Sequence, residues 1–206
     1  MPDSAKIAGI ILAGGLARRM GGGDKSMRHL GGRPVLDRVI ERLSPQIDVL
    51  ALNANGDASR FDAYGIAVLP DSEPEHPGPL AGVLAGLDWA ADQGIDRIVT
   101  VAADTPFFPA DLVSRLMQEG DGIVLAATPH PVKGSLRQPT FGLWPVALRE
   151  DLRTNLRQGV RKIVAWSDQH NGAEALFAAD PFDPFFNINT PEDMVIAETL
   201  LKDQKI

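Results

Sequence analysis

The 206-residue chain contains no cysteine. This absence excludes disulfides, zinc sites with thiolate ligands, iron–sulfur clusters and cysteine nucleophiles. Histidine is also scarce: the four histidines are scattered, and none has a partner at a spacing typical of a metal pair. We therefore expect no histidine-based metal site.

Long apolar runs are absent as well. No stretch approaches the ~20 residues that a membrane helix needs. The first residues, Met1–Lys6, lack the basic-then-apolar layout of a signal peptide. We therefore expect a soluble, cytoplasmic protein that does not enter a membrane.

Positive charge is in deficit, with 20 Lys and Arg against 27 Asp and Glu and a net charge of −7. This balance argues against a general nucleic-acid binder. Residues 16–42 nevertheless hold seven Lys or Arg and three Asp or Glu, so they carry +4 and leave −11 for the rest of the chain. Such a basic island indicates a local anion site. Arg38 and Arg42 are better explained as decoration of a helix face.

Short apolar runs alternate with amphipathic patterns. The runs typical of buried strands are Ile7–Leu12, Asp48–Asn53, Gly65–Leu69, Arg97–Ala102 and Gly122–Ala126, with helical patterns near 34–43, 79–93 and 109–119. This alternation predicts one α/β domain over residues 1–206, a three-layer, Rossmann-like fold with a mainly parallel sheet and helices on both faces.

The second half of the chain begins with a change of character. Prolines and glycines interrupt residues 128–145, which predicts an excursion that ends in an added strand at 139–144. Helices are expected near 146–157, 159–166 and 191–203. Thr190 is a suitable N-cap for the last of these, and Pro191 suits its first helical position.

The chain leaves its first strand through the glycine-rich stretch Leu12-Ala-Gly-Gly-Leu-Ala-Arg-Arg-Met-Gly-Gly-Gly-Asp-Lys25. Ligands of open parallel sheets bind beyond the carboxyl ends of the strands. Glycines let main-chain N–H groups approach an anion, and Arg18, Arg19 and Lys25 add positive charge. The stretch therefore predicts a polyphosphate cradle. It is neither a P-loop, because Asp24 separates Gly23 from Lys25, nor a dinucleotide fingerprint.

Acidic and amide side chains follow the other strands. Asp104, after the fourth strand, suits a Mg²⁺ ion that also binds substrate phosphates, although it could instead cap the next helix. Asp71 and Asn53 could read a base or ribose edge, although turn formation is the simpler role for both. The small residues Gly78–Gly82 either admit a flat base or pack a helix tightly on the sheet.

Taken together, these motifs resemble one family. The chain resembles the molybdenum cofactor guanylyltransferases in Leu12-Ala-Gly-Gly15, Arg19-Met-Gly-Gly22 with Asp24-Lys25, Gly78-Pro-Leu-Ala-Gly82, Asp104-Thr-Pro-Phe107 and Asn187-Ile-Asn-Thr-Pro-Glu192. The motifs stand in the family's order and span nearly the whole chain. The resemblance implies a nucleotide-diphospho-sugar transferase-like fold.

The resemblance also implies an activity: transfer of GMP from GTP to the terminal phosphate of molybdenum-bound molybdopterin, with release of pyrophosphate and a requirement for Mg²⁺. The GTP contacts that it implies are Leu12, Ala13, Gly14, Gly15, Lys25, Asn53, Asp71 and Asp104, with Asp104 also on the metal. The partners it implies are GTP, molybdenum-bound molybdopterin and, transiently, other cofactor-biosynthesis proteins and recipient molybdoenzymes.

The expected chemistry needs charge neutralisation rather than a strong base, because the attacking phosphate is already anionic. Arg19, Lys25, Asp104 and the N–H groups of residues 13–15 are expected to supply it, with Lys25 on the α-phosphate and Arg19 on pyrophosphate.

Each residue considered for the second substrate has two possible roles. Asn187 and Asn189 could meet that substrate or form a turn before Thr190. Arg137 and Gln138 could contact the pterin or its phosphate, or could simply be exposed on the surface. Trp144 and Trp166 could stack on the pterin ring, although core packing is the simpler role for both.

Two other readings share these features. A cytidylyltransferase on the same cofactor, or a nucleotidyltransferase on another phosphorylated metabolite, would keep the opening loop and Asp104. A non-catalytic nucleotide-binding module would keep the glycines and lose Lys25 or the metal carboxylate; both are present.

Overall fold

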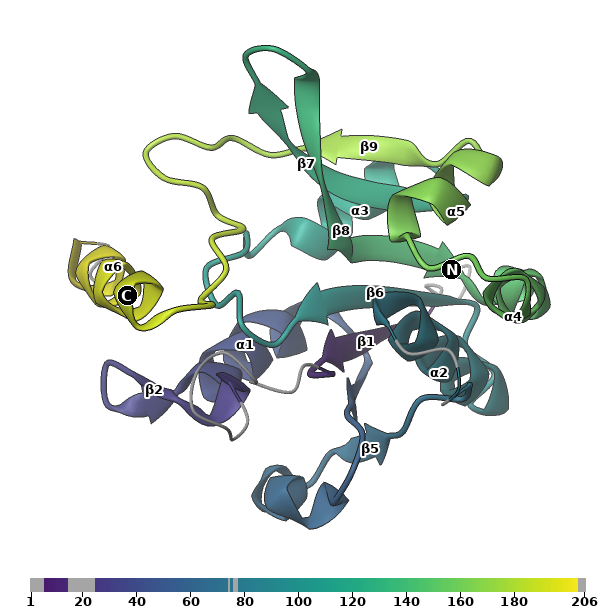
Figure 1. The fold of residues 1–206 in the computed structure, drawn as a ribbon, viewed down its shortest axis with the longest axis horizontal. Coiled ribbons are helices and arrows are strands. Elements are labelled where there is room, and N and C mark those ends of the chain that lie inside the picture. The colour runs from purple at the N-terminus through teal and green to yellow at the C-terminus, as the bar shows by residue number, and fades with distance from the viewer. Residues whose placement is uncertain (1–5, 15–24, 74, 76–77, 204–206) are drawn as a thin grey trace, which may run out of the picture.

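Seven strands form one sheet in the order β5-β4-β1-β6-β8-β7-β9 (Figure 1). In this computed structural model, residues 6–14, 25–73, 75 and 78–203 are described. The strand bounds are β1 Ile7–Leu12, β4 Val49–Asn53, β5 Ala67–Leu69, β6 Arg97–Ala102, β7 Val124–His130, β8 Gly134–Pro145 and β9 Ala173–Leu176. Strand β8 is antiparallel to both neighbours and the other pairs are parallel, which confirms the mainly parallel sheet.

Helices cover both faces of the sheet (Figure 1). They are α1 Val35–Leu43, α2 Pro79–Asp92, α3 Leu112–Gln118, α4 Arg149–Arg157, α5 Ile163–Gln169 and α6 Pro191–Asp203. Apolar side chains of α1 and α3 share one buried cluster with the sheet, and those of α2, α4 and α5 share the cluster on the opposite face. The three-layer α/β architecture is therefore confirmed.

Short elements fill the connections. The 3₁₀ helices are η1 Lys25–Met27, η2 Ser44–Gln46, η3 Ala58–Tyr64 and η4 Val146–Leu148. A small antiparallel ribbon of β2 His29–Leu30 and β3 Arg33–Pro34 leads into α1. None of the described helices is long and apolar enough to cross a membrane.

Helix α6 packs away from the main layers, beside β2 (Figure 1). Its buried Ala197 joins a third cluster with Leu30, Phe107 and Ile188. The predicted cap at its start is confirmed: the Asp193 N–H donates to Thr190 Oγ1 at 3.1 Å, and Asp193 Oδ2 accepts from the Thr190 N–H at 2.8 Å. This reciprocal pair satisfies N–H groups that a helix start leaves without intrahelical partners.

Two predicted helix starts are wrong. Helix α5 begins at Ile163 rather than near 159, because Gly159 turns the chain with a φ of 95°. Helix α3 begins at Leu112 rather than near 109, and the Asp111 side chain that precedes it makes no cap hydrogen bond.

The role expected for Arg38 and Arg42 is also wrong. Both are half-buried: Arg38 donates twice to the Leu30 carbonyl oxygen, and Arg42 donates to that of Phe108. Burial lowers the pKa of Arg42. These side chains anchor loops to α1 instead of decorating its surface.

Candidate active site

The carboxyl ends of four parallel strands bring the predicted nucleotide residues to one edge of the sheet. Asp71 follows β5, Asn53 ends β4, Leu12 ends β1 and Asp104 follows β6. The strands β5, β4, β1 and β6 are consecutive in the sheet, with Leu12 paired to Asn53 on one side and to Ala102 on the other. Residues far apart in the sequence therefore line one continuous edge.

Asn53 and Asp71 form a cluster with Asn55. Asn53 is 2% exposed, and its Nδ2 donates to Asp71 Oδ1 at 3.0 Å and to the Leu69 carbonyl oxygen at 3.0 Å. Asn55 Nδ2 donates to Asp71 Oδ2 at 2.8 Å, and Asn55 Oδ1 accepts the Asp71 N–H at 2.9 Å. Both oxygens of Asp71 are thus held, although a carboxylate has about four acceptor sites and two remain for a ligand.

Gly82 makes room for this cluster. A Cβ at Gly82 would lie 2.2 Å from Asn53 Oδ1 and 2.9 Å from Leu12 Cδ2. Gly78, which precedes α2, has a φ of 142° that residues with a side chain rarely adopt. Of the two roles predicted for this motif, the structure supports close packing of α2 on the sheet.

The glycine-rich loop is described only at its two ends. Ala13 follows β1, and its N–H donates to the Asn53 carbonyl oxygen at 2.9 Å. That N–H is therefore engaged by the sheet and does not face a phosphate, unlike our expectation. Gly14 is exposed. Gly15 and Arg19 lie outside the described residues, and Lys25 begins η1 on the far side of that gap.

Asp104 is half-buried just beyond β6. Its Oδ1 accepts from Thr105 Oγ1 at 3.4 Å, and its carbonyl oxygen accepts the Ile188 N–H at 2.9 Å. The second bond brings the segment that holds Asn187 and Asn189 against the end of β6. The described residues contain no group of three or more His, Cys, Asp or Glu placed to hold a metal. A single carboxylate fits a Mg²⁺ ion that takes its other ligands from phosphates and water.

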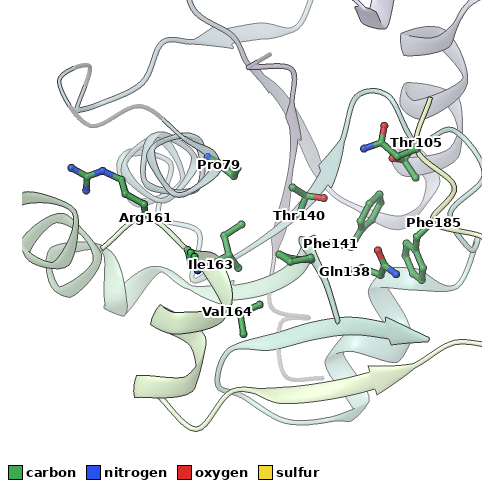
Figure 2. A pocket seen from close by; sticks show the side chains of 12 residues that line it. Pro79, Thr105, Gln138, Thr140, Phe141, Arg161, Ile163, Val164 and Phe185 are labelled. Carbon is green, nitrogen blue, oxygen red and sulfur yellow. The ribbon is translucent and has the colours of Figure 1, made fainter. Parts of the chain in front are cut away.

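A pocket of about 520 Å³ has Thr105, the residue after Asp104, in its lining (Figure 2). One wall comes from Pro79 and the residues that open α5, the other from Thr105, Phe141 and Phe185, and Thr140 lies between them. The remaining lining residues are Gln138, Pro139, Arg161, Lys162, Ile163, Val164 and Asn187. Its volume and its mixture of apolar and polar groups are typical of a small-molecule site.

A bulge in β8 forms part of this pocket. Strand β7 pairs Leu125 with Gly142 and then Ala126 with Gln138, so β8 carries three extra residues at this point. These residues, 139–141, line the pocket. Because a bulge redirects side chains and tolerates proline, it explains how a strand within the sheet exposes Thr140 and Phe141 to a cavity.

Of the remaining second-substrate candidates, Gln138 and Asn187 line the pocket. Arg137 instead bonds to Asp168 and Glu174, and these two hydrogen bonds raise its pKa. The hydrogen bonds from Ser135 and Arg137 in turn lower the pKa of Glu174. Arg137 is therefore committed to joining β8, α5 and β9.

The two tryptophans belong to the core. Trp144 and Trp166 are both fully buried and stack with ring centroids 5.8 Å apart. Core packing, one of the two roles considered for them, is confirmed. The Asn189 N–H donates to Asp193 Oδ2 at 2.9 Å, so the main chain of Asn189 belongs to the cap of α6.

Sequence reasoning missed Lys162, Phe185 and the bulge as parts of the site. Lys162 fell inside the helix predicted near 159–166, which gave it no signal of its own, and Phe185 lies in an irregular segment. The one available signal was Pro139 inside a predicted strand, since proline within a sheet marks an edge or a bulge.

A family profile described as the MobA-like NTP transferase domain matches residues 9–173. This chain belongs to that family. The matched span contains the whole strand edge from Asp71 to Asp104 and the bulge in β8. The family assignment makes the protein a nucleotidyltransferase.

Curated relatives of this MobA-like protein carry a more specific name. A protein from Bradyrhizobium sp. is 51% identical over 94% of this chain and 92% of its own length, and one from Nitrobacter hamburgensis is 50% identical over 93% of each. Both are named molybdenum cofactor guanylyltransferase. The predicted family resemblance is therefore confirmed.

Solved structures support the fold. A molybdopterin-guanine dinucleotide biosynthesis protein A from Archaeoglobus fulgidus has a TM-score of 0.74 at 24% identity, covering 95% of this chain and 99% of its own. A 4-diphosphocytidyl-2C-methyl-D-erythritol synthase from Anaerococcus prevotii has a TM-score of 0.74 at 17% identity, covering 96% of each chain. The same fold thus occurs in proteins whose names indicate different nucleotides.

Proposed function

We propose that this protein transfers GMP from GTP to the terminal phosphate of molybdenum-bound molybdopterin and releases pyrophosphate. The observation that carries the proposal is the order of groups along one sheet edge: Asp71 and Asn53, then the loop after β1, then Asp104, then the pocket beside β8. This order matches a base, a triphosphate, a metal and an acceptor laid out in line. The relatives' shared name selects guanine and molybdopterin as the substrates.

The donor half binds GTP in this proposal. Asp71 contacts the base, the buried Asn53 holds the Asp71 carboxylate in place, and the loop that begins after Leu12 binds the triphosphate. The Asp71 carboxylate has two acceptor sites left after Asn53 and Asn55 are bound, which suits the adjacent N–H groups of a guanine edge. Ala13 contributes through its backbone link to Asn53, since its N–H is already engaged.

Asp104 is the proposed protein ligand of Mg²⁺. When bound, the ion would neutralise phosphate charge and lower the cost of bringing the anions together. The position of Asp104 in the chain supports this assignment, because it directly follows β6 at the sheet edge and its neighbour Thr105 lines the pocket. Thr105 and the Ile188 N–H hold its side-chain and main-chain oxygens, respectively.

The pocket beside β8 takes molybdopterin in this proposal. Thr105, Gln138 and Asn187 supply polar groups, Phe141 and Phe185 supply apolar surface, and Lys162 supplies a charge for the acceptor phosphate. The guanidinium of Arg161 points away from the cavity in Figure 2 and donates to the Leu156 and Val160 carbonyl oxygens, so its stem forms the wall.

In the reaction, an oxygen of the acceptor phosphate forms a bond to the α-phosphorus of GTP as the bond from that phosphorus to the pyrophosphate oxygen breaks. The attacking oxygen is already anionic at neutral pH, so no general base is required. The approaching phosphates repel by roughly 1–4 kcal/mol per adjacent pair of charges at ~4 Å. Lys25 offsets this repulsion at the α-phosphate and Arg19 at the departing pyrophosphate.

The test is to incubate the protein with Mg²⁺, molybdenum-bound molybdopterin and each of GTP, CTP, ATP and UTP. We expect a guanine dinucleotide and pyrophosphate from GTP alone. Lys25→Ala should lower kcat by at least ~10²-fold, in the range of a lost transition-state contact, and Asp104→Asn should abolish metal-dependent turnover. A preference for CTP, or wild-type turnover by both variants, would refute the proposal.

We further propose that the protein works in the cytoplasm and contacts other cofactor-biosynthesis proteins and recipient molybdoenzymes transiently. The chemistry of the product supports the contact, because a completed cofactor must pass from this enzyme to an apoenzyme. Release of the completed cofactor into solution at a rate that does not depend on the concentration of the recipient would contradict it.

A further inference from the structure

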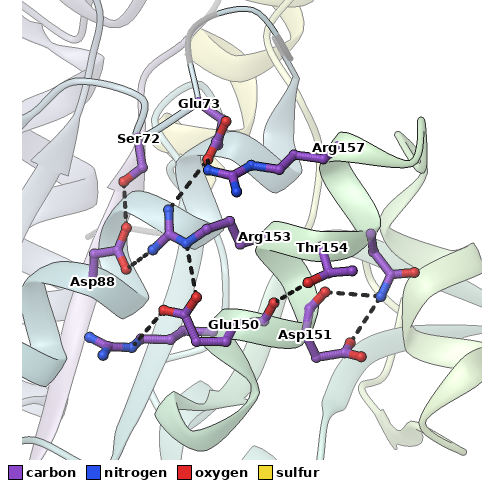
Figure 3. A network of polar contacts seen from close by, with 10 residues as sticks. Ser72, Glu73, Asp88, Glu150, Asp151, Arg153, Thr154 and Arg157 are labelled. Carbon is purple, nitrogen blue, oxygen red and sulfur yellow. Dashed lines mark hydrogen bonds and ion pairs between the residues drawn. The ribbon is translucent and has the colours of Figure 1, made fainter.

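A second polar network holds the two residues that follow Asp71 in the chain. These residues, Ser72 and Glu73, are bound to groups on helices α2 and α4 (Figure 3). At the centre of the network is the guanidinium of Arg153, on α4. It contacts carboxylates from three separate elements: Glu73 in the loop after β5, Asp88 on α2 and Glu150 on α4.

These contacts attach the loop at two points. Ser72 Oγ donates to Asp88 Oδ2 at 2.7 Å, while Arg153 Nη2 donates to the other oxygen of Asp88 at 2.6 Å. Arg153 Nη1 also lies 3.5 Å from Glu73 Oε1, which accepts from Arg157 Nη2 at 2.7 Å. The residues that follow Asp71 are therefore fixed to α2 through Asp88 and to α4 through Glu73.

Burial distinguishes Arg153 from Arg157, the other arginine that contacts Glu73. The side chains of Glu73, Arg153 and Asp88 are 15%, 20% and 26% exposed, whereas that of Arg157 is 62% exposed. Hydrogen bonds from Arg157 and then Arg153 lower the pKa of Glu73, so the carboxylate is charged at neutral pH. Without Arg153, Glu73 would keep Arg157 and Asp88 would keep the Ser72 hydroxyl, but the cation that joins these two partly buried carboxylates would be lost. Asp88 would then lack the cation that offsets its charge, which is costly for a partly buried group.

We propose that Arg153 is a positioning residue for recognition of the nucleotide base, because it fixes Ser72 and Glu73 against α2 and α4 and thereby holds Asp71 where it meets the base. The inference rests on the proposed function, in which Asp71 faces guanine. Asn53 and Asn55 orient the Asp71 carboxylate from the strand side, and the Arg153 network restrains the same segment from the helix side. Both are needed, since a hydrogen bond weakens steeply outside a narrow range of distance and angle.

The base contact itself provides a specific readout. Guanine offers a ring N–H and an exocyclic amine to a carboxylate, whereas hypoxanthine offers the ring N–H and lacks the amine. A correctly held Asp71 should therefore favour GTP over ITP. A loss of stability alone would lower turnover with both nucleotides and leave their ratio unchanged.

The experiment compares Arg153→Met and Arg153→Lys with wild type, using KM and kcat for GTP and for ITP. Arg149→Met is the matched control, because Arg149 lies on the same helix and pairs only with the exposed Glu150 among the ion pairs found in the described residues. Asp71→Ala is assayed in parallel to test the base contact. Melting temperatures and assays well below them separate folding from recognition.

We expect Arg153→Met to raise the KM for GTP about tenfold, equivalent to ~1.4 kcal/mol, with kcat changed less than about twofold and the preference for GTP over ITP largely lost. Arg153→Lys should recover part of that preference, because lysine keeps the charge and loses the planar fork. Arg149→Met should match wild type in the KM and kcat for GTP and in the preference for GTP over ITP.

Three results decide the matter. If Asp71→Ala removes the preference and Arg153→Met does too, the inference is supported. If Asp71→Ala removes it while both Arg153 variants retain it, Arg153 is not a positioning residue, although the base contact stands. If Asp71→Ala leaves the preference intact, the base contact proposed for Asp71 is wrong, and the inference fails with it. Arg153→Lys decides the second case if Arg153→Met does not fold.

Discussion

Gly82→Ala is the substitution whose effect follows most directly from the geometry. An alanine Cβ would lie 2.2 Å from Asn53 Oδ1 and 2.9 Å from Asn53 Cγ. Ordinary contact distances begin near ~3.5 Å, so the amide must retreat by roughly 1 Å or more. The 3.0 Å bonds from Asn53 Nδ2 to the Leu69 carbonyl oxygen and to Asp71 would then be lost.

The magnitude follows from these separate contributions. Overpacking costs ~1–3 kcal/mol. The bond to a neutral carbonyl contributes ~1 kcal/mol and the bond to the Asp71 carboxylate ~1.5–3 kcal/mol. Alanine regains ~0.5–1 kcal/mol over glycine inside a helix. We therefore expect a net loss of ~2.5–6.5 kcal/mol, which for a chain of 206 residues corresponds to a fall in Tm of roughly 5–26 °C.

Calorimetry and titration with GTP are the assays. Gly122→Ala is the control, because a Cβ there meets nothing within 4 Å; its Tm should stay near that of wild type. Asn53→Ala removes the amide with which the new methyl collides and leaves the contact with Leu12 Cδ2 at 2.9 Å. Gly82→Ala should therefore cost clearly less stability in the Asn53→Ala background than in wild type. Additive losses in the double variant, or a Gly82→Ala protein with wild-type Tm and GTP affinity, would refute the reasoning.

Three further predictions concern other parts of the molecule. The pKa of Glu174 is held below its ordinary value of 4.5, so the ionised carboxylate stabilises the fold above pH 4.5, and this stabilisation is lost as the pH falls through the lower pKa of the folded state. Glu174→Gln should therefore reduce the fall in Tm on the acid side of a Tm-against-pH profile, and an unchanged acid side would contradict the prediction. Lys162→Ala should raise the KM for molybdopterin about fivefold, in line with ~1 kcal/mol for one screened charge contact, and leave the KM for GTP unchanged, whereas the exposed Lys202→Ala on α6 should alter neither. Gly31→Ala should destabilise by ~1–3 kcal/mol, because its φ of 59° is strained for alanine; its Cβ would also displace the side-chain ends of Leu201 on α6 and Arg38, which adds to that cost. Gly32→Ala, with a φ of 79° and nothing within 4 Å of its Cβ, should cost less, and equal melting temperatures would exclude a cost of the displaced side chains.

The fold was predictable where local pattern and tertiary context agree. Strands such as Ile7–Leu12 and Arg97–Ala102 are continuous apolar runs, buried on both faces of the sheet, and their predicted bounds are those observed. Strand β9, Ala173–Leu176, was missed, since alanine, glutamate and leucine do not favour strands; its pairing with β7 overrides that preference.

Part of the candidate site was likewise predictable from the sequence and part was not. The donor edge was predictable because each polar residue follows a recognisable strand, and parallel strands end at one edge. The pocket was not, since it depends on a register shift between β7 and β8 and on the irregular segment that holds Phe185. The Arg153 network was not predictable either, because its carboxylates are separated by up to 77 positions and meet only when α4 packs beside α2.

The strand order also sets a length scale. From β5 to β8 there are four strand intervals, or ~19 Å at ~4.8 Å each, and this spacing is fixed by main-chain hydrogen bonds rather than by side chains. In the proposed function, this spacing would set the distance that GTP spans between Asp71 and the acceptor pocket beside β8. Substitutions at either end can alter what is recognised there, but only the insertion or loss of a whole strand would change the distance between the two.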